Sequence, residues 1–263
     1  MLSPDIFSAE WLITLYYLVI LTLVILVAKV VSTFVAGRTL RGEARFLLLA
    51  PVLSISSWQQ MLLLGRPDKR SLLYKGMIFL PLMVIVFLWV PTLTSDMAWW
   101  VRSYLAILPF WLLIETIQLL VELCWSKVNR SVPPISQHPL VAKSVADFWG
   151  RRWNRLFGDW FRQVCFRPLA RQPILALTVT FVISGLIHEL LVSLPLWFVY
   201  RVNCFGWMVG YFLLQLLAIL IERQWLRQIP RLNRPFVWLV VLIPAPLILN
   251  QGTLLIFHLA IMS

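Results

Sequence analysis

The chain has 263 residues, of which 60% are apolar and only 13% are charged. Soluble domains usually carry about a quarter of charged residues, so this composition argues against a soluble globular enzyme. With 14 Trp, 16 Phe and only 10 Gly, the chain is neither collagen-like nor of low complexity. The net charge is +12, and the basic residues that produce it lie in short segments between long apolar runs. This pattern is typical of a membrane protein rather than of a nucleic-acid-binding protein.

Several apolar stretches are long enough to cross a bilayer. They cover residues 11–34, 76–94, 99–123, 174–194, 205–221 and 236–262. The first is not expected to be a cleaved signal peptide, because Asp5 and Glu10 stand where basic residues would precede one. The last contains Pro244-Ala245-Pro246, which predicts either a broken helix or a tight hairpin. We therefore expect an all-α, polytopic transmembrane bundle of about six to eight helices.

One further apolar stretch, residues 46–64, is not expected to span the membrane. It begins FLLLAPVL but continues SISSWQQ, and basic residues flank it on both sides. A true span should separate a basic side from a side poor in Lys and Arg, so we interpret this stretch as re-entrant or interfacial. Of the 23 Lys and Arg residues, 20 then fall on one side of the membrane. The positive-inside rule predicts an N-terminus outside and a cytoplasmic loop over residues 124–172.

The end of this cytoplasmic loop, residues 147–172, is rich in aromatic and basic residues. Its large apolar residues recur in steps of three and four, which predicts an amphipathic helix. They are Trp149, Trp153, Leu156, Phe157, Trp160, Phe161 and Val164, and most arginines take the other face. Two interpretations stay open: an interfacial helix anchored by its aromatic residues, or a set of arginines that bind the phosphates of a co-substrate such as coenzyme A.

An ionisable pair, His188 and Glu189, interrupts the apolar stretch 174–194. Polar groups at such depth are energetically costly and usually face a cavity or the bundle interior. His188 follows Pro173 by 15 residues, about 22 Å at helical rise, which places it near or past the middle of the bilayer. Since burial disfavours the imidazolium, we expect a neutral ring that can accept a proton from a hydroxyl. The alternative is a packing histidine that a neighbouring helix satisfies.

Three neighbours of His188 also carry predictions. Ser184 precedes it by one turn and could fix the tautomer of the ring. Gly185 would let a neighbouring backbone or a ligand approach closely. Glu189 points about 100° away from His188 around the helix, so we do not expect its carboxylate to orient the ring.

Two motifs in this region are long enough to compare with known families. Residues 144–154 read SVADFWGRRWN, and residues 184–190 read SGLIHEL. They resemble the DFWGRRWN signature and the SGLMHEL block of the wax synthase branch of the membrane-bound O-acyltransferase superfamily, and they stand in the same order. Residues 211–215 read YFLLQ where that branch usually has an aromatic-His-Gly pattern. The resemblance covers about residues 137–222, the core motif region of what we expect to be one integral-membrane domain over residues 1–263.

The resemblance implies direct transfer of an acyl group from acyl-CoA to a hydroxyl, without a covalent enzyme intermediate. His188 matches the catalytic base of the family, and Asn154 matches its second signature residue, which helps to position substrates. We add contacts to the CoA head group as our own inference: Arg151, Arg152, Trp153 and Arg155. We expect acyl-CoA to reach His188 through an internal tunnel and a long-chain alcohol, or a similar lipid hydroxyl, to enter from the bilayer.

Two other functions stay open. The chain could be a non-enzymatic membrane protein that handles lipids or solutes, with its polar span residues lining a binding or conduction path. It could also be an O-acyltransferase whose acceptor is a sterol, a glycerolipid or a polyketide. We expect no metal site, no bound cofactor and no nucleic-acid partner, with acyl-CoA as a co-substrate. A bacterial inner membrane and the endoplasmic reticulum fit the sequence equally well.

Overall fold

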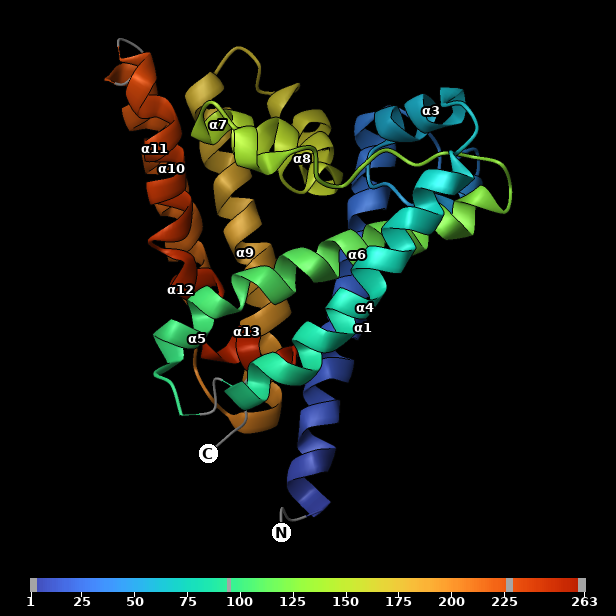
Figure 1. Ribbon diagram of the computed structural model, residues 1–263. Helices are drawn as coiled ribbons and strands as arrows, with labels where there is room; N and C mark the ends of the chain where they lie inside the picture. Colours follow the sequence, from blue (N-terminus) through green and yellow to red (C-terminus); the bar gives the residue numbers. More distant parts are fainter. Residues whose placement is uncertain (1–3, 94–95, 226–228, 260–263) are drawn as a thin grey trace. The chain divides into compact units, whose positions relative to one another are not determined.

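The computed structural model describes residues 4–93, 96–225 and 229–259, which form helices and connecting loops without a strand among them (Figure 1). Within these residues, five helices are long and apolar enough to cross a membrane, judged by length and composition. They are Trp11–Val35, Lys69–Val90, Trp99–Ser126, Pro173–Tyr200 and Arg231–Ile248. The prediction of an all-α, polytopic membrane protein is confirmed.

The helices differ widely in length. The longer ones are α1 (Pro4–Val35), α4 (Lys69–Leu93), α6 (Ile107–Ser126), α9 (Pro173–Tyr200), α10 (Trp207–Gln224) and α11 (Pro230–Leu242). The shorter ones are α2 (Ala44–Leu49), α3 (Ile55–Leu63), α5 (Trp99–Leu105), α7 (Val145–Asp147), α8 (Arg155–Phe161), α12 (Ala245–Ile248) and α13 (Gln251–Ile256). Between them lie a 3-10 turn, η1 (Pro139–Val141), and two π-helical turns, η2 (Phe148–Arg152) and η3 (Arg162–Phe166).

The chain folds into two compact units. Unit 1 contains the chain up to Val24, the segment Val86–Leu108 and the chain from Leu177 onwards. Unit 2 contains Ile25–Ile85 and Pro109–Ala176. Helices α1, α4, α6 and α9 each begin in one unit and end in the other. The prediction of a single domain over the whole chain stays a prediction.

Two of the predicted spans take a different form. The stretch predicted over 205–221 forms α10, which has 18 residues and is not among the five apolar helices; it carries Gln215 and ends in Glu222-Arg223-Gln224. The stretch predicted over 236–262 is the broken helix rather than the hairpin, because α11, α12 and α13 follow one another with turns between them. Its last residues, 260–262, lie outside the described part of the chain.

As predicted, the stretch 46–64 does not form a membrane-spanning helix. It folds in unit 2 into α2 and α3, with a bend over residues 50–54. The last carbonyl groups of a short helix lack partners within the helix. Here the buried ammonium of Lys29, from α1, donates to the carbonyl oxygens of Leu47 (3.1 Å) and Ala50 (2.8 Å). Lys29, although it lies in an apolar helix, therefore caps the C-terminal end of α2.

The aromatic and basic segment 147–172 is helical but is not the single amphipathic helix that its periodicity predicts. It divides into α7, η2, α8 and η3, with a break at Asn154. Asn154 has a left-handed backbone (φ 41°, ψ 58°), which a continuous right-handed helix cannot contain. Trp160 and Phe161 are buried, and the indole Nε1 of Trp160 donates to the carbonyl oxygen of Ala28 at 2.7 Å. Part of the predicted membrane-facing side is thus packed against α1 within unit 2.

In unit 1, α10 packs against α11 and α12, and its polar residues repair a defect that proline creates. The carbonyl of Val240 would normally accept from the amide of residue 244, which is a proline and has no N–H. The side chain of Gln215 donates to this carbonyl oxygen at 2.8 Å, and the Tyr211 hydroxyl donates to that of Val241 at 3.2 Å. The polar ends of the YFLLQ segment therefore have a structural role.

Candidate active site

His188 lies in α9, in unit 1, and its side chain is half-buried. The Nδ1 atom lies 2.7 Å from the carbonyl oxygen of Ser184. A carbonyl oxygen only accepts, so Nδ1 carries the hydrogen and Nε2 of the neutral ring is left as the basic nitrogen. No described residue forms a hydrogen bond with Nε2. Ser184 therefore contacts the ring as expected, although through its main-chain carbonyl; that it fixes the tautomer stays a prediction.

An aromatic side chain supports the imidazole. The ring of Phe212, from α10, has its centroid 4.6 Å from that of His188 and is tilted by 46°. Phe212 is buried and also contacts Phe181 of α9 and Tyr211 of its own helix. One side of the imidazole therefore meets an apolar wall.

Glu189 is buried beside His188 and binds the start of the next helix. Its Oε1 atom accepts from the backbone N–H groups of Gly206 (2.7 Å), Met208 (3.0 Å) and Val209 (3.2 Å). Its Oε2 atom accepts from the hydroxyl of Ser193. As predicted, this carboxylate does not bind the imidazole of His188 directly, whereas its role as a helix cap was not predicted. The sequence signal for this cap is Gly206, because this N-cap residue of α10 has no side chain that could bind the first amides of the helix.

Gly185 allows α9 and α10 to approach closely, as predicted. A Cβ atom at this position would lie 2.9 Å from the Cα atom of Val209 and 3.3 Å from its Cγ2 atom. Real Cβ atoms do not come this close to a backbone atom, so only glycine fits. The SGLIHEL segment thus supplies a close contact, a basic imidazole and a helix cap within five consecutive residues.

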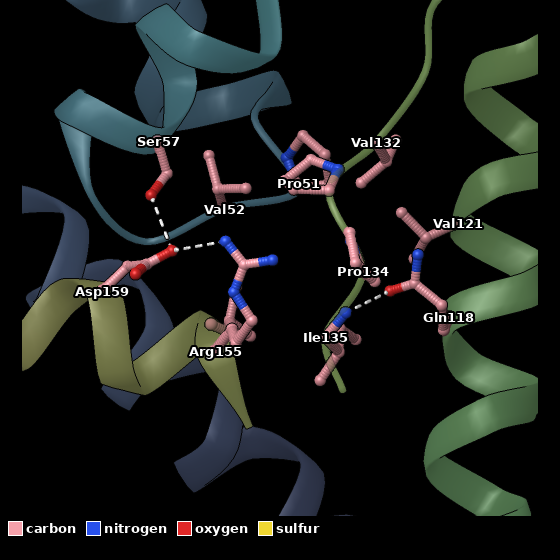
Figure 2. Close-up of a pocket in the computed structure, with 12 residues that line it drawn as sticks. Pro51, Val52, Ser57, Gln118, Val121, Val132, Pro134, Ile135, Arg155 and Asp159 are labelled. Carbon is pink, nitrogen blue, oxygen red and sulfur yellow. Dashed lines mark hydrogen bonds and ion pairs between the residues drawn. The ribbon is translucent and has the colours of Figure 1, made fainter. Parts of the chain in front are cut away.

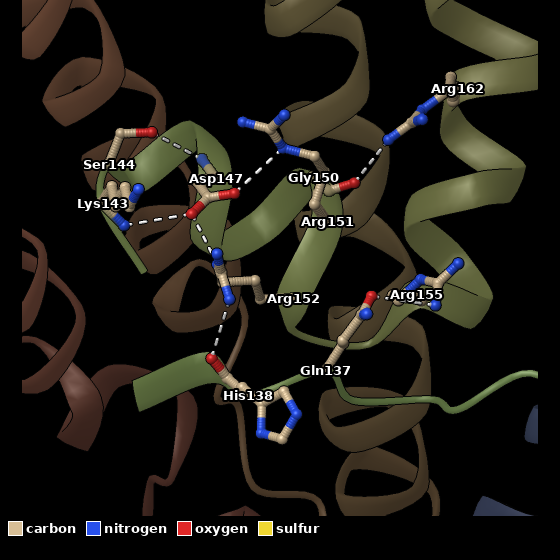
Figure 3. Close-up of polar contacts among 10 residues, drawn as sticks. All are labelled: Gln137, His138, Lys143, Ser144, Asp147, Gly150, Arg151, Arg152, Arg155 and Arg162. Carbon is tan, nitrogen blue, oxygen red and sulfur yellow. Dashed lines mark hydrogen bonds and ion pairs between the residues drawn. The ribbon is translucent and has the colours of Figure 1, made fainter. Parts of the chain in front are cut away.

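In unit 2, the DFWGRRWN segment is organised around Asp147 (Figure 3). Its two carboxylate oxygens bind Nε of Arg151 (3.0 Å) and Nε of Arg152 (2.6 Å), and the amide of Lys143 donates to Oδ2 (3.1 Å). Burial alone would raise the pKa of Asp147, but the Arg152 hydrogen bond, the Lys143 amide and the two arginine charges together lower it below its ordinary value. The sequence analysis does not single out this aspartate, although its place four residues before Arg151 and five before Arg152 is a visible signal.

The arginines predicted to bind CoA differ in their surroundings. Arg152 is mostly buried and also donates to the carbonyl oxygen of His138 (3.3 Å), so it fastens the loop before the motif. Arg155 donates to Oε1 of Gln137 (3.3 Å) and lies 3.8 Å from Asp159. The side chain of Arg151 is 71% exposed and binds Asp147 through Nε. Its two terminal nitrogens form no hydrogen bond with a described residue. Arg151 is the most accessible of the three to an anionic ligand.

Aromatic stacking and main-chain bonds fix the residues around Asn154. Trp153 stacks on Phe148, with centroids 5.8 Å apart and an interplanar angle of 9°. The amide of Gln137 donates to the carbonyl of Arg152, and the amide of Arg155 donates to that of Ile135, both at 2.7 Å. The Asn154 carbonyl accepts from Gly158, whereas its side-chain amide forms no hydrogen bond with the described residues.

Residues 131–137 run past this segment, and residues 132–135 help to line a small pocket in unit 2 (Figure 2). The amide of Ile135 donates to Oε1 of Gln118 (3.0 Å). On the other side, the Ser57 hydroxyl donates to Asp159 (3.3 Å), beside the guanidinium of Arg155. The pocket is therefore lined mostly by apolar residues, and the ion pair of Arg155 and Asp159 forms one of its sides.

The predicted site residues are divided between the units: His188 belongs to unit 1, whereas Asn154, Trp153 and the three arginines belong to unit 2. Their roles in catalysis and in CoA binding stay predictions.

Asn154 allows its two possible roles to be separated. Glycine adopts the left-handed backbone without strain, so Asn154→Gly removes the carboxamide and keeps the fold, whereas Asn154→Ala costs about 1–2 kcal/mol of backbone strain. If the carboxamide positions substrate, Asn154→Gly keeps the wild-type unfolding temperature and loses acyl transfer. Full activity of Asn154→Gly would show that only the backbone conformation matters. Thermal unfolding and ester formation, measured on the same preparations, decide between the two roles of Asn154.

Comparison with known proteins places both motifs in one family segment. Residues 132–197 match the family model described as "Membrane bound O-acyl transferase family". Over 66 residues, the chain is 35% identical to a long-chain-alcohol O-fatty-acyltransferase of Simmondsia chinensis, covering 21% of this chain and 19% of that protein. The resemblance to the wax synthase branch is confirmed.

Other relatives are also similar to part of the chain. Over 89 residues, it is 30% identical to the probable long-chain-alcohol O-fatty-acyltransferase 3 of Arabidopsis thaliana, covering 30% of this chain and 26% of that protein. Over 72 residues, it is 35% identical to acyl-CoA–sterol O-acyltransferase 1 of the same plant, covering 24% and 21%. The matched stretches thus span 19 to 26% of the length of these wax-synthase-like and sterol-acylating relatives.

Proposed function

We propose that this membrane protein is an O-acyltransferase that transfers a fatty acyl group from acyl-CoA to the hydroxyl of a long-chain alcohol. The observation that carries the proposal is the state of His188 inside the family segment. Its Nδ1–H is held by the Ser184 carbonyl, and its basic Nε2 forms no hydrogen bond with the described residues. A packing histidine would be expected to have both ring nitrogens satisfied by protein groups.

The proposed reaction has one chemical step. Nε2 of His188 accepts the hydroxyl proton as the alcohol oxygen attacks the carbonyl carbon of the thioester. The carbon–sulfur bond then breaks, and the imidazolium returns the proton to the leaving thiolate, which gives the ester and free CoA. The Ser184 carbonyl stabilises the imidazolium by accepting from Nδ1–H. General-base catalysis of this kind contributes about 10²- to 10⁴-fold, and positioning of the two substrates adds to it.

The motif in unit 2 suits the polar end of the co-substrate. Guanidinium groups bind phosphates with paired hydrogen bonds, and Arg151 has its terminal nitrogens exposed. The positive-inside rule puts this segment in the cytoplasm, where acyl-CoA is found, and the N-terminus on the opposite side. We propose that Arg151 and Arg155 contact the CoA phosphates and that Arg152 mainly holds the loop.

The test is acyl transfer by the purified protein in lipid vesicles. Labelled acyl-CoA is offered with a long-chain alcohol, a sterol or a diacylglycerol, and the labelled products are separated. The proposal predicts a labelled ester that requires both acyl-CoA and the alcohol. Sterol or glycerolipid esters in place of the alcohol ester would overturn the acceptor assignment. Folded protein that binds lipid but forms no ester with any acceptor would favour the non-enzymatic alternative.

A further inference from the structure

Helix α10 begins without a cap of its own. Its N-cap residue is Gly206, whose φ of 102° needs glycine and whose missing side chain cannot bind the exposed amides of the first turn. Glu189, 17 residues earlier on α9, takes this role through three backbone N–H groups that converge on one carboxylate oxygen. A negative charge at this position also interacts favourably with the positive end of the helix dipole.

The capped end of α10 is connected to the wall behind His188. Phe212 follows Met208 by four residues, so the two lie one turn apart on the same face of α10. Met208 donates its amide to Glu189, and Phe212 carries the ring that contacts the imidazole. On α9, His188 and Glu189 are adjacent. The carboxylate therefore fixes the start of the helix whose next turn supports the imidazole.

We infer that Glu189 is a positioning residue for His188, acting through α10 and Phe212 rather than by contact with substrate. Its carboxylate is buried and both of its oxygens already bind protein groups, because Oε1 accepts from three amides and Oε2 accepts from the Ser193 hydroxyl. With α10 held, Phe212 restricts the imidazole to the orientation in which Nδ1–H meets the Ser184 carbonyl. The inference rests on the proposed function of His188 as a base.

Two variants of Glu189 separate shape from charge. Glu189→Gln keeps one carbonyl oxygen for the three amides of α10, so His188 should stay in place. Glu189→Asp keeps the charge but is shorter by one methylene group, so its carboxylate cannot reach the same amides. The expected results are wild-type kcat for Glu189→Gln and a kcat reduced by about 10- to 100-fold for Glu189→Asp, with KM for acyl-CoA changed by no more than about twofold.

A second readout does not depend on activity. The chain has three histidines, so protein labelled with ¹⁵N-histidine in nanodiscs gives few side-chain signals, and those of His188 are identified by their loss in His188→Asn. We expect wild type and Glu189→Gln to show His188 as a single neutral tautomer with the proton on Nδ1. Glu189→Asp and Phe212→Ala should both show a mixture of tautomers.

A matched control tests whether loss of any helix cap has this effect. Asn250 caps α13 in the same unit by accepting from the amide of Thr253 at 3.0 Å. Asn250→Ala should lower the unfolding temperature and leave the His188 signals and kcat unchanged. A coupled pair also gives non-additive effects, so Glu189→Asp combined with Phe212→Ala should lower kcat little more than the stronger single variant.

The outcomes distinguish the inference from the function on which it rests. Unchanged His188 signals and unchanged kcat in Glu189→Asp would overturn the positioning role, as would additive effects in the double variant. If Glu189→Asp does not fold, Phe212→Ala decides, and an unchanged tautomer in that variant overturns the inference. Ester formation that survives in His188→Asn would overturn the proposed function, while the spectra of the Glu189 variants would still decide the positioning role.

Discussion

Gly185→Ala is expected to lower the stability of the protein, although alanine normally stabilises a helix. Alanine is favoured over glycine in helix interiors by about 1 kcal/mol. At this position its Cβ atom would meet the Cα atom of Val209 at 2.9 Å, and a backbone atom cannot rotate away as a side chain can. Overpacking of this kind costs about 1–3 kcal/mol, so the net effect is a lower unfolding temperature. Displacement of α10 should also loosen the Glu189 cap and reduce acyl transfer.

Gly210→Ala is the matched control for this prediction. Gly210 lies in α10, one residue after Val209, and a Cβ atom there would have no neighbour within 4 Å. We expect Gly210→Ala to keep or raise the unfolding temperature, because only the gain in helix propensity applies. Thermal unfolding of both variants in the same detergent makes the comparison. Equal unfolding temperatures for Gly185→Ala and wild type would show that α9 and α10 are not in close contact at Gly185.

His188→Asn is expected to reduce ester formation by about 10²- to 10⁴-fold, which is the usual contribution of a general base. The asparagine amide can still donate to the Ser184 carbonyl, so the local fold should be kept. It has no basic nitrogen in the place of Nε2, so the hydroxyl proton has no acceptor. His188→Ala should lose the same activity and also leave a space beside Phe212, with a lower unfolding temperature.

A second histidine in the same unit serves as the control. His258 lies with Nε2 3.1 Å from the hydroxyl of Thr14 and packs on Trp11, and it belongs to no part of the proposed mechanism. His258→Ala should therefore keep kcat, measured per folded protein. A loss of activity in His258→Ala as large as that in His188→Asn would contradict the assignment of the base.

The class of fold and several local features could be predicted from the sequence, because they depend on neighbours along the chain. Long apolar runs predict the main helices, and the basic flanks of the mixed stretch 46–64 predict that it does not span the membrane. Gly185 predicts a close approach because a small residue in an apolar helix lets a neighbouring backbone come near. In each case, residues within about one turn or one loop carry the information.

Features that depend on distant partners could not be predicted. The helix periodicity over 147–172 gave no sign of the break at Asn154, which main-chain bonds to Ile135 and Gln137 stabilise on either side. The cap that Glu189 provides depends on amides 17 to 20 residues away. Residue spacing along one helix indicates which side chains share a face, but it does not indicate which groups of another segment they meet.

His188 is proposed to accept the hydroxyl proton in the step that forms the ester. Single-turnover kinetics test it most directly, with reconstituted protein in excess over labelled acyl-CoA and a long-chain alcohol present. This design measures the chemical step without product release. We predict that wild-type protein converts the label to ester and that His188→Asn, folded to the same extent, does so at least about 10²-fold more slowly. Equal rate constants for the two proteins would contradict the assignment of His188 as the base.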